Sequence, residues 1–308
     1  MSSVVLLFSG QGAQRVGMGR DFYDSSPEAR ALFEKAAETL PELQSVMFDG
    51  PDEQLTRTSF CQPALYLHGL VALEMLKLAV PNLDPVAAAG LSLGEFTAHA
   101  AAGSFDFNTG LNIVAQRGRF MEEACEATDG SMAAMIGGDE EAVKKLAEDT
   151  GVDVANFNAP GQIVLSGSVA GIDQAVAQAK ERGIRMAKKL NVAGAYHSSL
   201  MQSAQEKLAA TLASSKIDAP GIQVVCNYAA VPVATPNEVR SMAEKQVTGS
   251  VRWTESMKFL IDRGHTRFVE LGPGKVLAGL MGRIDKSVEV ISVEDLPSLE
   301  AAAEKLND

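Results

Sequence analysis

The sequence predicts an α/β fold with a mainly parallel sheet and a smaller inserted subdomain. Two observations lead to this prediction. Over residues 1–127, short apolar runs typical of buried strands alternate with longer stretches that have a helical pattern. From about 128 to 193 the pattern changes to short segments in the order strand, helix, strand, strand, helix, strand. Alternation of the first kind places helices on both faces of a parallel sheet.

The first part of the chain supplies the core elements. Glycines mark several ends, since the first strand runs into Gly10, the second into Gly90, and the following helix stops at Gly103. Asn108 is the expected cap of a long helix. The predicted elements are strands at 4–8 and 86–89 and helices at 27–40, 63–80, 95–102 and 109–126.

The predicted insert follows Thr128-Asp129-Gly130. Its expected elements are a strand at 131–136, a helix at 140–149, strands at 152–156 and 163–166, a helix at 169–182 and a strand at 184–190, with a turn at 158–161. This is the ferredoxin-like βαββαβ order. After it the α/β pattern resumes, with a helix near 198–214, strands near 222–227 and 267–271, and a helix or frayed end after 294. The expected division is a core of residues 1–127 and 194–308 with a small subdomain at 128–193.

Composition excludes several classes of protein. The 308 residues carry 27 Lys plus Arg and 39 Asp plus Glu, a formal net charge of −12, which argues against a whole-molecule contact with nucleic acid or an anionic membrane. Cys61, Cys125 and Cys226 form no CxxC pair, so neither a disulfide framework nor a metal site is expected. No apolar run is long enough to span a membrane. We expect a cytoplasmic monomer.

The motif Gly90-Leu91-Ser92-Leu93-Gly94 matches G-x-S-x-G and lies between a predicted strand and a predicted helix. This is the setting of a nucleophile elbow, in which glycines permit a sharp turn that projects the serine hydroxyl from the edge of the sheet. Ser92 is therefore the candidate nucleophile, and the amide of Leu93 would face a developing oxyanion. The alternative is a glycine-rich turn with a capping serine.

Gln11 stands in a second glycine turn, directly after the first predicted strand. Because parallel strands end at the same edge of a sheet, this residue would lie beside Ser92, and its amide would be a second oxyanion donor. A purely structural turn is equally compatible with these letters. A dinucleotide-binding fingerprint is disfavoured because its third glycine falls at Arg15.

Four histidines are available as a general base. His68 lies in an apolar helical pattern, and His99 follows Glu95 by four residues on one predicted helix, which favours a local pair. His197 and His265 both stand in turns of small residues. Position alone leaves these last two as candidates, with His197 preferred.

Arg117 has an unusual setting on its predicted helix. Its neighbours at the helical spacings of three and four residues are all apolar, whereas those of Arg119 are largely polar. A buried arginine needs an anionic partner. That partner is either a structural carboxylate or a substrate carboxylate held by two hydrogen bonds.

Two other patterns carry no chemistry. Gly272-Pro273-Gly274-Lys275 looks like part of a P-loop, but Val276 stands where Ser or Thr is required, so we interpret the segment as a turn. Metal-ligand spacings such as HExxH are absent from the sequence.

These motifs together resemble the family of malonyl-CoA:acyl carrier protein transacylases, the loading enzymes of bacterial-type fatty acid synthesis. The matches follow the family's order from about residue 4 to 285. They are FSGQGAQRVGMG at 8–19, QPAL at 62–65, GLSLGEFTAHAAAG at 90–103, QRGRFMEEA at 116–124, NFNAPGQIVLSG at 156–167, GAYHS at 194–198, QVTGSVRW at 246–253 and ELGPGKVLAGL at 270–280.

The resemblance implies a fold, a chemistry and partners. It implies an α/β-hydrolase-like core with a ferredoxin-like insert, no cofactor, malonyl-CoA as the donor substrate and acyl carrier protein as the partner. Ser92 would be the acylated nucleophile and His197 its general base. The amides of Gln11 and Leu93 would form the oxyanion hole.

The resemblance also assigns the carboxylate site. Arg117 would hold the malonyl carboxylate, and Gln246 would orient the histidine base through its carbonyl. Tyr196 resembles the aromatic position that favours malonyl over methylmalonyl units in related polyketide acyltransferases, although Phe is commoner there. The chain departs from the family at Ser9, where Pro is frequent, and at Leu91, where His is frequent. Leu91 leaves the position beside the nucleophile without a hydrogen-bonding group.

Other functions stay open on the sequence. A serine esterase would share Ser92 but use a late base, for which His265 is the candidate. An acyltransferase of a polyketide pathway would share the whole site. A degenerate acyltransferase that only docks a carrier protein is disfavoured, because the candidate nucleophile, base and arginine are all intact.

The charges are segregated along the chain. The stretch 180–189 holds five basic residues and one acid, a net of +4. Because coenzyme A and typical carrier proteins are anionic, we predict that this stretch helps to receive one of them. The alternative is a solvated basic end of a helix. The basic residues are Lys180, Arg182, Arg185, Lys188 and Lys189.

Overall fold

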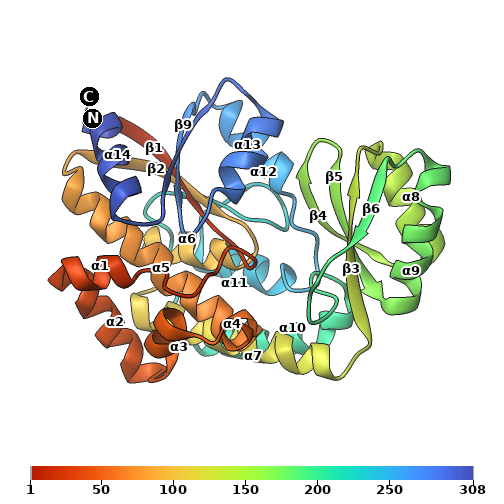
Figure 1. Cartoon of the computed structure of the whole chain (residues 1–308), viewed down its shortest axis with the longest axis horizontal. Coiled ribbons are helices and arrows are strands. Elements are labelled where there is room, and N and C mark those ends of the chain that lie inside the picture. Colours follow the sequence, from red (N-terminus) through yellow and green to blue (C-terminus); the bar gives the residue numbers. More distant parts are fainter. Residues whose placement is uncertain (1, 308) are drawn as a thin grey trace.

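The computed structural model describes residues 2–307, which form two adjoining bodies of unequal size (Figure 1). The larger body holds a six-stranded sheet with strand order β10-β9-β1-β2-β7-β8. Neighbouring strands from β10 to β7 are parallel, and β8 is antiparallel to β7. This confirms the predicted α/β fold with a mainly parallel sheet. The strands are β1 (Ser2–Phe8), β2 (Leu83–Gly90), β7 (Gln223–Val225), β8 (Pro232–Val233), β9 (Arg267–Leu271) and β10 (Glu289–Val293).

Helices cover both faces of this sheet. They are α1 (Arg20–Ser25), α2 (Pro27–Thr39), α3 (Leu43–Asp49), α4 (Asp52–Thr56), α5 (Thr58–Ala79), α6 (Leu93–Ala101), α7 (Phe107–Glu126), α10 (Gln202–Ser214), α11 (Pro236–Lys245), α12 (Trp253–Ile261), α13 (Val276–Ile284) and α14 (Leu296–Asn307), with a 3₁₀ turn η2 (Ser199–Met201) before α10. In β1, Val4, Leu6 and Phe8 pack in one core with α5, whereas Val5 and Leu7 pack in a second core with α12 and α13. Burial on both sides explains why this strand is apolar from Val4 to Phe8.

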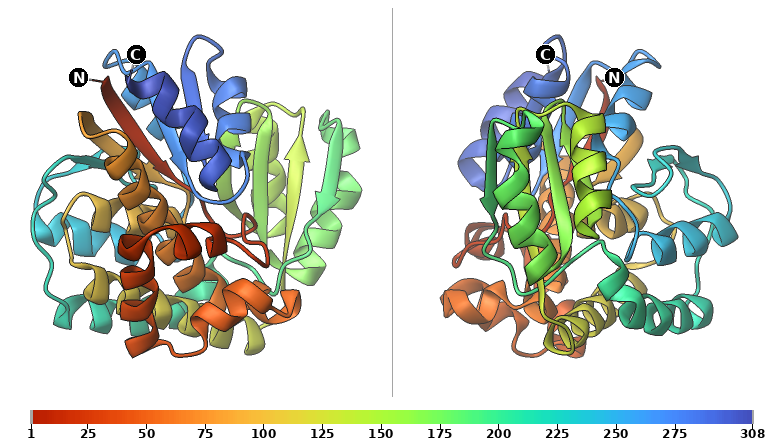
Figure 2. Two further views of the ribbon diagram at one scale, coloured as in Figure 1. Left: turned by 60° about the vertical axis from the view of Figure 1, so that its left-hand side comes forward. Right: turned by 90° about the vertical axis from the view of Figure 1, so that its right-hand side faces the viewer.

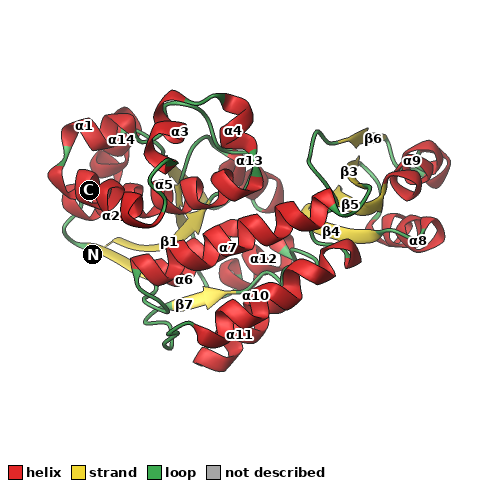
Figure 3. Ribbon diagram, turned by 90° about the horizontal axis from the view of Figure 1, so that it is seen from below, coloured by secondary structure: helices red, strands yellow, loops and turns green. Residues whose placement is uncertain are grey.

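The smaller body is a four-stranded antiparallel sheet of order β4-β5-β3-β6 with two helices on one face. Its elements are β3 (Gly130–Ile136), α8 (Glu140–Thr150), β4 (Asp153–Ala159), β5 (Gln162–Ser168), α9 (Val169–Gln178), the 3₁₀ turn η1 (Lys180–Arg182) and β6 (Met186–Lys189). The strand and helix order is the predicted one. Met135 and Leu165 pack under the helices, whereas Met132 and Val164 belong to the core shared with the larger body. Figure 3 shows α8 and α9 on the side away from the larger body.

The two bodies are joined by backbone hydrogen bonds as well as by the chain. The Phe157 amide in β4 donates to the Val251 carbonyl at 2.9 Å, and the Val251 amide donates to the Ala155 carbonyl at 2.8 Å. Beneath the larger sheet, α7 and α10 run side by side toward the small sheet (Figure 3). Figure 2 shows the small sheet next to the larger body. The face of the small sheet that carries no helices is turned toward the larger body.

The turns after β1 and β2 lie side by side at one edge of the large sheet. Phe8 is paired with Gly90 at the end of the two strands, and the Leu91 amide donates to the Phe8 carbonyl at 3.1 Å. The loop that carries Gln11 therefore adjoins the loop that carries Ser92, as the parallel arrangement predicts.

Several element boundaries differ from the predicted ones. Helix α7 begins at Phe107 because the cap is Asp106, whose Oδ1 accepts from the Thr109 amide at 2.7 Å, and not Asn108. Pro63 lies inside α5 rather than at its start. In the smaller body, the predicted helix at 169–182 ends at Gln178 and gives way to η1. The predicted four-residue turn is shorter, because 158 and 159 belong to β4.

Eight elements lack a counterpart among those predicted from the sequence, namely α1, α3, α4, α11, α12, α13, β8 and β10. Most of these elements are short, with few residues in which a periodic pattern could emerge. Across residues 2–307, no helix combines the length and the apolar character needed to cross a membrane.

Candidate active site

Ser92 stands at the sharp turn between β2 and α6. Its backbone has φ 53° and ψ −105°, a region that residues other than glycine seldom occupy. The flanking glycines are required by close backbone approaches: a Cβ on Gly90 would lie 1.9 Å from the Gly94 carbonyl carbon, and one on Gly94 would lie 2.1 Å from the Phe8 oxygen. The geometry is that of a nucleophile elbow, with the serine before the first turn of a helix.

His197 meets Ser92 from the segment that returns from the smaller body. Its Nε2 lies 2.7 Å from Ser92 Oγ, and its Nδ1 lies 2.8 Å from the Gln246 backbone carbonyl. A carbonyl can only accept, so Nδ1 carries the hydrogen and Nε2 is free to accept the serine proton. Burial and the Arg117 charge lower the pKa of His197 to about 4, which keeps the ring neutral near pH 7.

His265, the other candidate base, lies in a different place. It precedes β9, and β9 is parallel to β1, whereas the Ser92 turn follows the end of β2. The two residues therefore belong to opposite edges of the sheet. The structure brings Ser92 together with His197 and not with His265.

Arg117 is buried on α7, with 1% of its surface exposed. Its Nη2 donates to Ser92 Oγ at 3.1 Å and to Gln246 Oε1 at 2.9 Å, and its Nη1 donates to Gln62 Oε1 at 2.7 Å. Nε has no partner in the part of the chain that the structure describes. All three acceptors are neutral, so the charge of this guanidinium meets no carboxylate at contact distance within residues 2–307.

Gln246, at the end of α11, connects these groups. Besides accepting from His197 through its backbone carbonyl, it uses both ends of its side chain. Oε1 accepts from Arg117, and Nε2 donates to the Ser92 carbonyl at 3.0 Å and to Glu95 Oε2 at 2.8 Å. One residue thus contacts His197, Arg117 and the turn that carries Ser92.

Gln11 and Tyr196 line the same cavity as Ser92. Gln11 Nε2 lies 3.4 Å from the Tyr196 hydroxyl, which in turn lies 2.6 Å from Thr58 Oγ1. The hydroxyl that distinguishes Tyr from Phe at this position therefore links the Gln11 loop to α5. Leu93 begins α6, so its amide is among the unpaired donors at the helix start.

A cavity of about 430 Å³ opens at this point between the two bodies. A cavity of this volume suits a small-molecule ligand. The turns of the large sheet form one wall, and the open face of the small sheet forms the other. The lining includes Gly10, Gln11, Gln62, Leu91, Ser92, Met121, Met132, Asn156, Asn158, Val164, Leu190, Tyr196 and His197.

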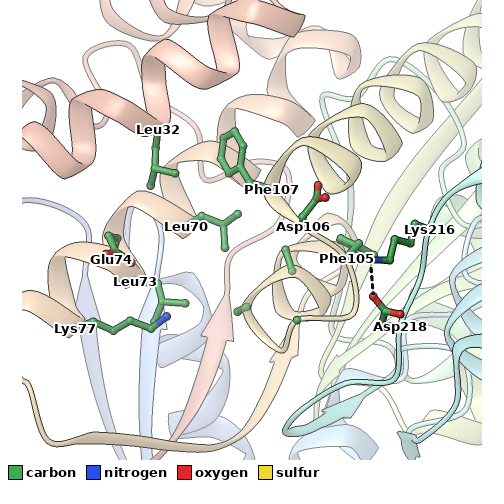
Figure 4. Close-up of a pocket in the computed structure, with 13 residues that line it drawn as sticks. Leu32, Leu70, Leu73, Glu74, Lys77, Phe105, Asp106, Phe107, Lys216 and Asp218 are labelled. Carbon is green, nitrogen blue, oxygen red and sulfur yellow. Dashed lines mark ion pairs between the residues drawn. The ribbon is translucent and has the colours of Figure 1, made fainter.

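A second cavity, of about 440 Å³, lies between α2, α5 and the start of α7 (Figure 4). Its floor is apolar, and its rim holds charges of both signs, including Lys216 and Asp218, which lie 3.7 Å apart. None of the candidate catalytic side chains reaches it. Within residues 2–307 no cluster of three or more His, Cys, Asp or Glu side chains is arranged to hold a metal ion.

Three further residues take part in the site. Asn227 Oδ1 accepts from the Ser92 amide at 2.7 Å, and its Nδ2 donates to the Gly90 carbonyl at 2.8 Å. Glu95 accepts from the Asn227 amide at 2.7 Å. Gln62 and Glu95 stand inside sequence motifs and could have been singled out there, whereas Asn227 follows a short strand with no motif around it.

Comparison with known proteins shows the family to which the chain belongs. The model of the family described as "Acyl transferase domain" matches residues 5–301. This chain is therefore an acyltransferase.

Individual relatives narrow the class. The chain is 40% identical to the malonyl CoA-acyl carrier protein transacylase of Bacillus subtilis (strain 168), with 100% of this chain and 98% of that protein covered. It is 37% identical to the protein of the same name from Haemophilus influenzae, with 99% and 100% covered. The chain belongs to the malonyl CoA-acyl carrier protein transacylase family, which confirms the resemblance found in the sequence.

Solved structures agree. The malonyl CoA-acyl carrier protein transacylase of Coxiella burnetii superposes with a TM-score of 0.95 at 32% identity, covering 100% of this chain and 98% of that one. A malonyl-transacylase in complex with its type II polyketide acyl-carrier protein superposes with a TM-score of 0.94 at 32% identity, covering 99% and 100%.

Proposed function

We infer that this protein transfers the malonyl group of malonyl-CoA to the phosphopantetheine thiol of an acyl carrier protein, for fatty acid synthesis. The names of its relatives support this reaction. The observation that carries the inference is the position of Arg117, whose Nη2 lies 3.1 Å from Ser92 Oγ. A buried cation beside a nucleophile suits an acyl group that carries its own carboxylate.

The proposed reaction has two half-reactions through a malonyl-serine. In the first, His197 Nε2 takes the Ser92 proton as Oγ attacks the thioester carbonyl. The carbon–sulfur bond breaks, and the proton passes from His197 to the sulfur of coenzyme A. In the second, the carrier-protein thiol gives its proton to His197 and attacks the ester, which regenerates the Ser92 hydroxyl.

The amides of Gln11 and Leu93 are the proposed oxyanion hole. Their loops are adjacent, because β1 and β2 are paired up to Phe8 and Gly90. The Leu93 amide also lies at the start of α6, where the helix dipole favours negative charge. One donor of this kind contributes roughly 3 kcal/mol to stabilisation of the transition state.

We propose that the core, residues 1–127 and 194–308, is of α/β-hydrolase type and that 128–193 is a ferredoxin-like subdomain. The elbow at the end of a parallel strand supports the first assignment. The antiparallel order β4-β5-β3-β6 with α8 and α9 on one face supports the second. In this arrangement the core supplies the catalytic groups and the insert supplies the opposite wall of the cavity. A monomeric state, a cytoplasmic location and the lack of a cofactor stay predictions.

Two other functions use the same nucleophile. An esterase with His265 as base is disfavoured by the 2.7 Å contact between Ser92 and His197, and loss of activity only on His265→Ala would revive it. Service to a polyketide pathway is compatible with the relative that binds a polyketide carrier protein. Turnover with carrier proteins of the two pathways separates the latter possibility from fatty acid synthesis.

Covalent malonylation tests the proposed function directly. Incubation with malonyl-CoA should add one malonyl group to the wild-type protein, detected by intact-mass measurement, and Ser92→Ala should remain unmodified. A carrier protein in its thiol form should then remove the group. Malonylation retained by the Ser92→Ala variant would contradict the assignment of the nucleophile.

A further inference from the structure

Glu95 and His99 form a buried pair on α6, next to the nucleophile turn. Neither side chain is exposed. Glu95 Oε1 and His99 Nε2 lie 4.0 Å apart, and among the described residues neither atom has a hydrogen-bond partner. At 4.0 Å the two atoms are beyond hydrogen-bond distance, so Glu95 Oε1 is a buried carboxyl oxygen that accepts no hydrogen bond from residues 2–307 and can take a proton without losing one.

The histidine can adapt to either state of this pair. Burial lowers the pKa of His99 to about 3, so the ring is neutral. Its Nδ1 lies 3.1 Å from Ser104 Oγ, a hydroxyl that can donate or accept. With the hydrogen on Nε2, the ring donates toward a Glu95 carboxylate. With the hydrogen on Nδ1, the Nε2 lone pair faces a protonated Glu95 carboxyl, whose Oε1 lies 4.0 Å away.

The second oxygen of Glu95 is linked to Arg117. Oε2 accepts from the Asn227 amide at 2.7 Å and from Gln246 Nε2 at 2.8 Å. The other end of the Gln246 amide, Oε1, accepts from Arg117 Nη2 at 2.9 Å. A chain of carboxylate, amide and guanidinium thus connects a buried negative group with a buried positive group that has no direct ion pair.

We propose that Glu95 balances the charge of Arg117 in the free enzyme, and that it takes up a proton on Oε1, the oxygen that faces His99 Nε2, when the malonyl carboxylate binds Arg117. The inference rests on the proposed roles of Ser92 and Arg117. Its physical basis is that two carboxylates in a dry site cannot both remain ionised beside one cation. Glu95 touches neither the substrate nor the reacting atoms, so it is a positioning and charge-balancing residue.

The surroundings make Glu95 the group whose protonation changes when the malonyl carboxylate binds. Burial raises the pKa of Glu95 to about 7, against the lowering effect of its two hydrogen bonds and of Arg117. The other titratable groups nearby do not change charge near neutrality. His99 and His197 are neutral, Arg117 keeps its charge with a pKa of about 10, and burial raises the pKa of Cys226 to about 11.

Proton uptake by Glu95 can be measured separately from the protons that the transfer reaction itself moves. When malonyl-serine forms, the Ser92 proton leaves on the sulfur of coenzyme A, so the transfer itself takes no proton from solvent. At pH 7.5 the released thiol is ionised to roughly one tenth, which returns a small and known amount of acid. Any net uptake therefore reports a protein group whose pKa rises as the malonyl carboxylate arrives.

The experiment combines a pH-indicator dye with intact-mass measurement in one weakly buffered sample. At pH 7.5 a carboxyl with a pKa of about 7 is roughly three-quarters ionised. Wild-type enzyme should therefore take up as much as three-quarters of a proton, roughly, for each malonyl-serine formed. Glu95→Gln keeps the acceptor oxygen and should load malonyl with no uptake. Glu123→Gln, which changes an exposed carboxylate on α7, should behave as wild type.

The pH dependence gives a second readout that needs no variant. At pH 6 Glu95 is already protonated in the free enzyme, so uptake by the wild type should be several-fold smaller than at pH 7.5. Malonyl-serine formation without proton uptake, equal uptake in Glu95→Gln, or uptake that does not vary with pH would overturn the proposal. Failure of the wild type to form malonyl-serine would instead contradict the proposed function.

Discussion

At the scale of single residues, Arg117 is the most informative side chain. It is held by three neutral acceptors and packs over the Phe96 ring at 5.1 Å. A buried charge without a contacting counterion costs several kcal/mol unless something else compensates it. This arrangement leaves the guanidinium available for a substrate carboxylate, and it favours such a ligand over one that brings no charge.

Arg117→Ala is expected to change substrate preference rather than abolish the chemistry. Loss of a charge-assisted contact should lower kcat/KM for malonyl-CoA by roughly 10- to 100-fold, whereas kcat/KM for acetyl-CoA should change far less. The ratio of the two constants is the measurement. Arg119→Ala removes an exposed arginine of the same helix and serves as the control. An equal fall for both thioesters would identify Arg117 as a structural residue.

Some residues of the candidate site can be predicted from the sequence and others cannot. Ser92 and Gln11 follow apolar runs and stand in glycine motifs, so local pattern and the rule of the common sheet edge were enough to bring them together. Asn227 was not found, because its contacts with Ser92 and Glu95 span more than a hundred residues of chain. The family resemblance suggested Gln246 as the residue that orients His197, but its links to Arg117 and Glu95 appear only in three dimensions.

At the scale of elements, the strands and the long amphipathic helices are predictable, and their ends are less so. β1 and β2 contain short apolar runs, α6 and α7 have helical patterns, and all four elements lie close to their expected positions. Asn108 was wrongly chosen as the cap of α7, since Asp106 is an equally good acceptor and only the backbone conformation decides between them. Short helices such as α3 and α4 leave no period to detect.

The basic side chains of residues 180–189 do not all lie on the same side of the small sheet. Lys188 is paired with Ala134, on the face of the small sheet that also carries the cavity-lining Met132. Lys189 is paired with Ala133 and extends to the helix layer, where it contacts Asp173 at 2.5 Å. Arg182 likewise pairs with Asp149 at 2.7 Å. Of Lys188 and Lys189, Lys188 is therefore the residue on the cavity side of the small sheet.

Lys188→Glu should therefore raise the KM for the carrier protein several-fold at low salt, and the effect should shrink as salt screens the charge. Lys189→Glu is the matched control and should change KM much less, because this side chain is on the helix side. KM values at low and high ionic strength provide the test. Equal effects of the two substitutions, or none, would leave only a solvated basic segment.

At the scale of the whole molecule, two acidic stretches of the chain lie next to each other. The acidic stretches 21–58 and 285–308 adjoin each other, as shown by the Leu296 amide, which donates to Asp21 Oδ2 at 2.7 Å. In Figure 1 the helices α1, α2 and α14, which carry part of these stretches, lie on the side of the larger body opposite to β6. The net charge of −12 is therefore unevenly distributed, and this polarity would guide an anionic donor or carrier toward the cavity side.

Buried titratable groups link the whole fold to pH. His68, His99 and His197 have pKa values lowered by burial to about 4, 3 and 4. In the unfolded chain each histidine has a pKa of about 6.5, so between pH 6.5 and 4 the unfolded state binds protons that the native state does not. Glu95 acts in the opposite sense, because its raised pKa lets the native state bind a proton in this range. Glu270 is raised in the same direction.

The histidines outnumber the carboxyls, so acidification from pH 6.5 to 5 should destabilise the protein. Each group contributes at most about 1.4 kcal/mol per pH unit, and a net excess of one to two protons predicts a loss of roughly 2 kcal/mol. Urea midpoints at the two pH values measure this loss. His68→Gln keeps a donor for the Glu294 carbonyl but removes one titrating group, so it should reduce the loss by about 1 kcal/mol. A urea midpoint that is unchanged between the two pH values would mean that these histidines already titrate normally in the native state.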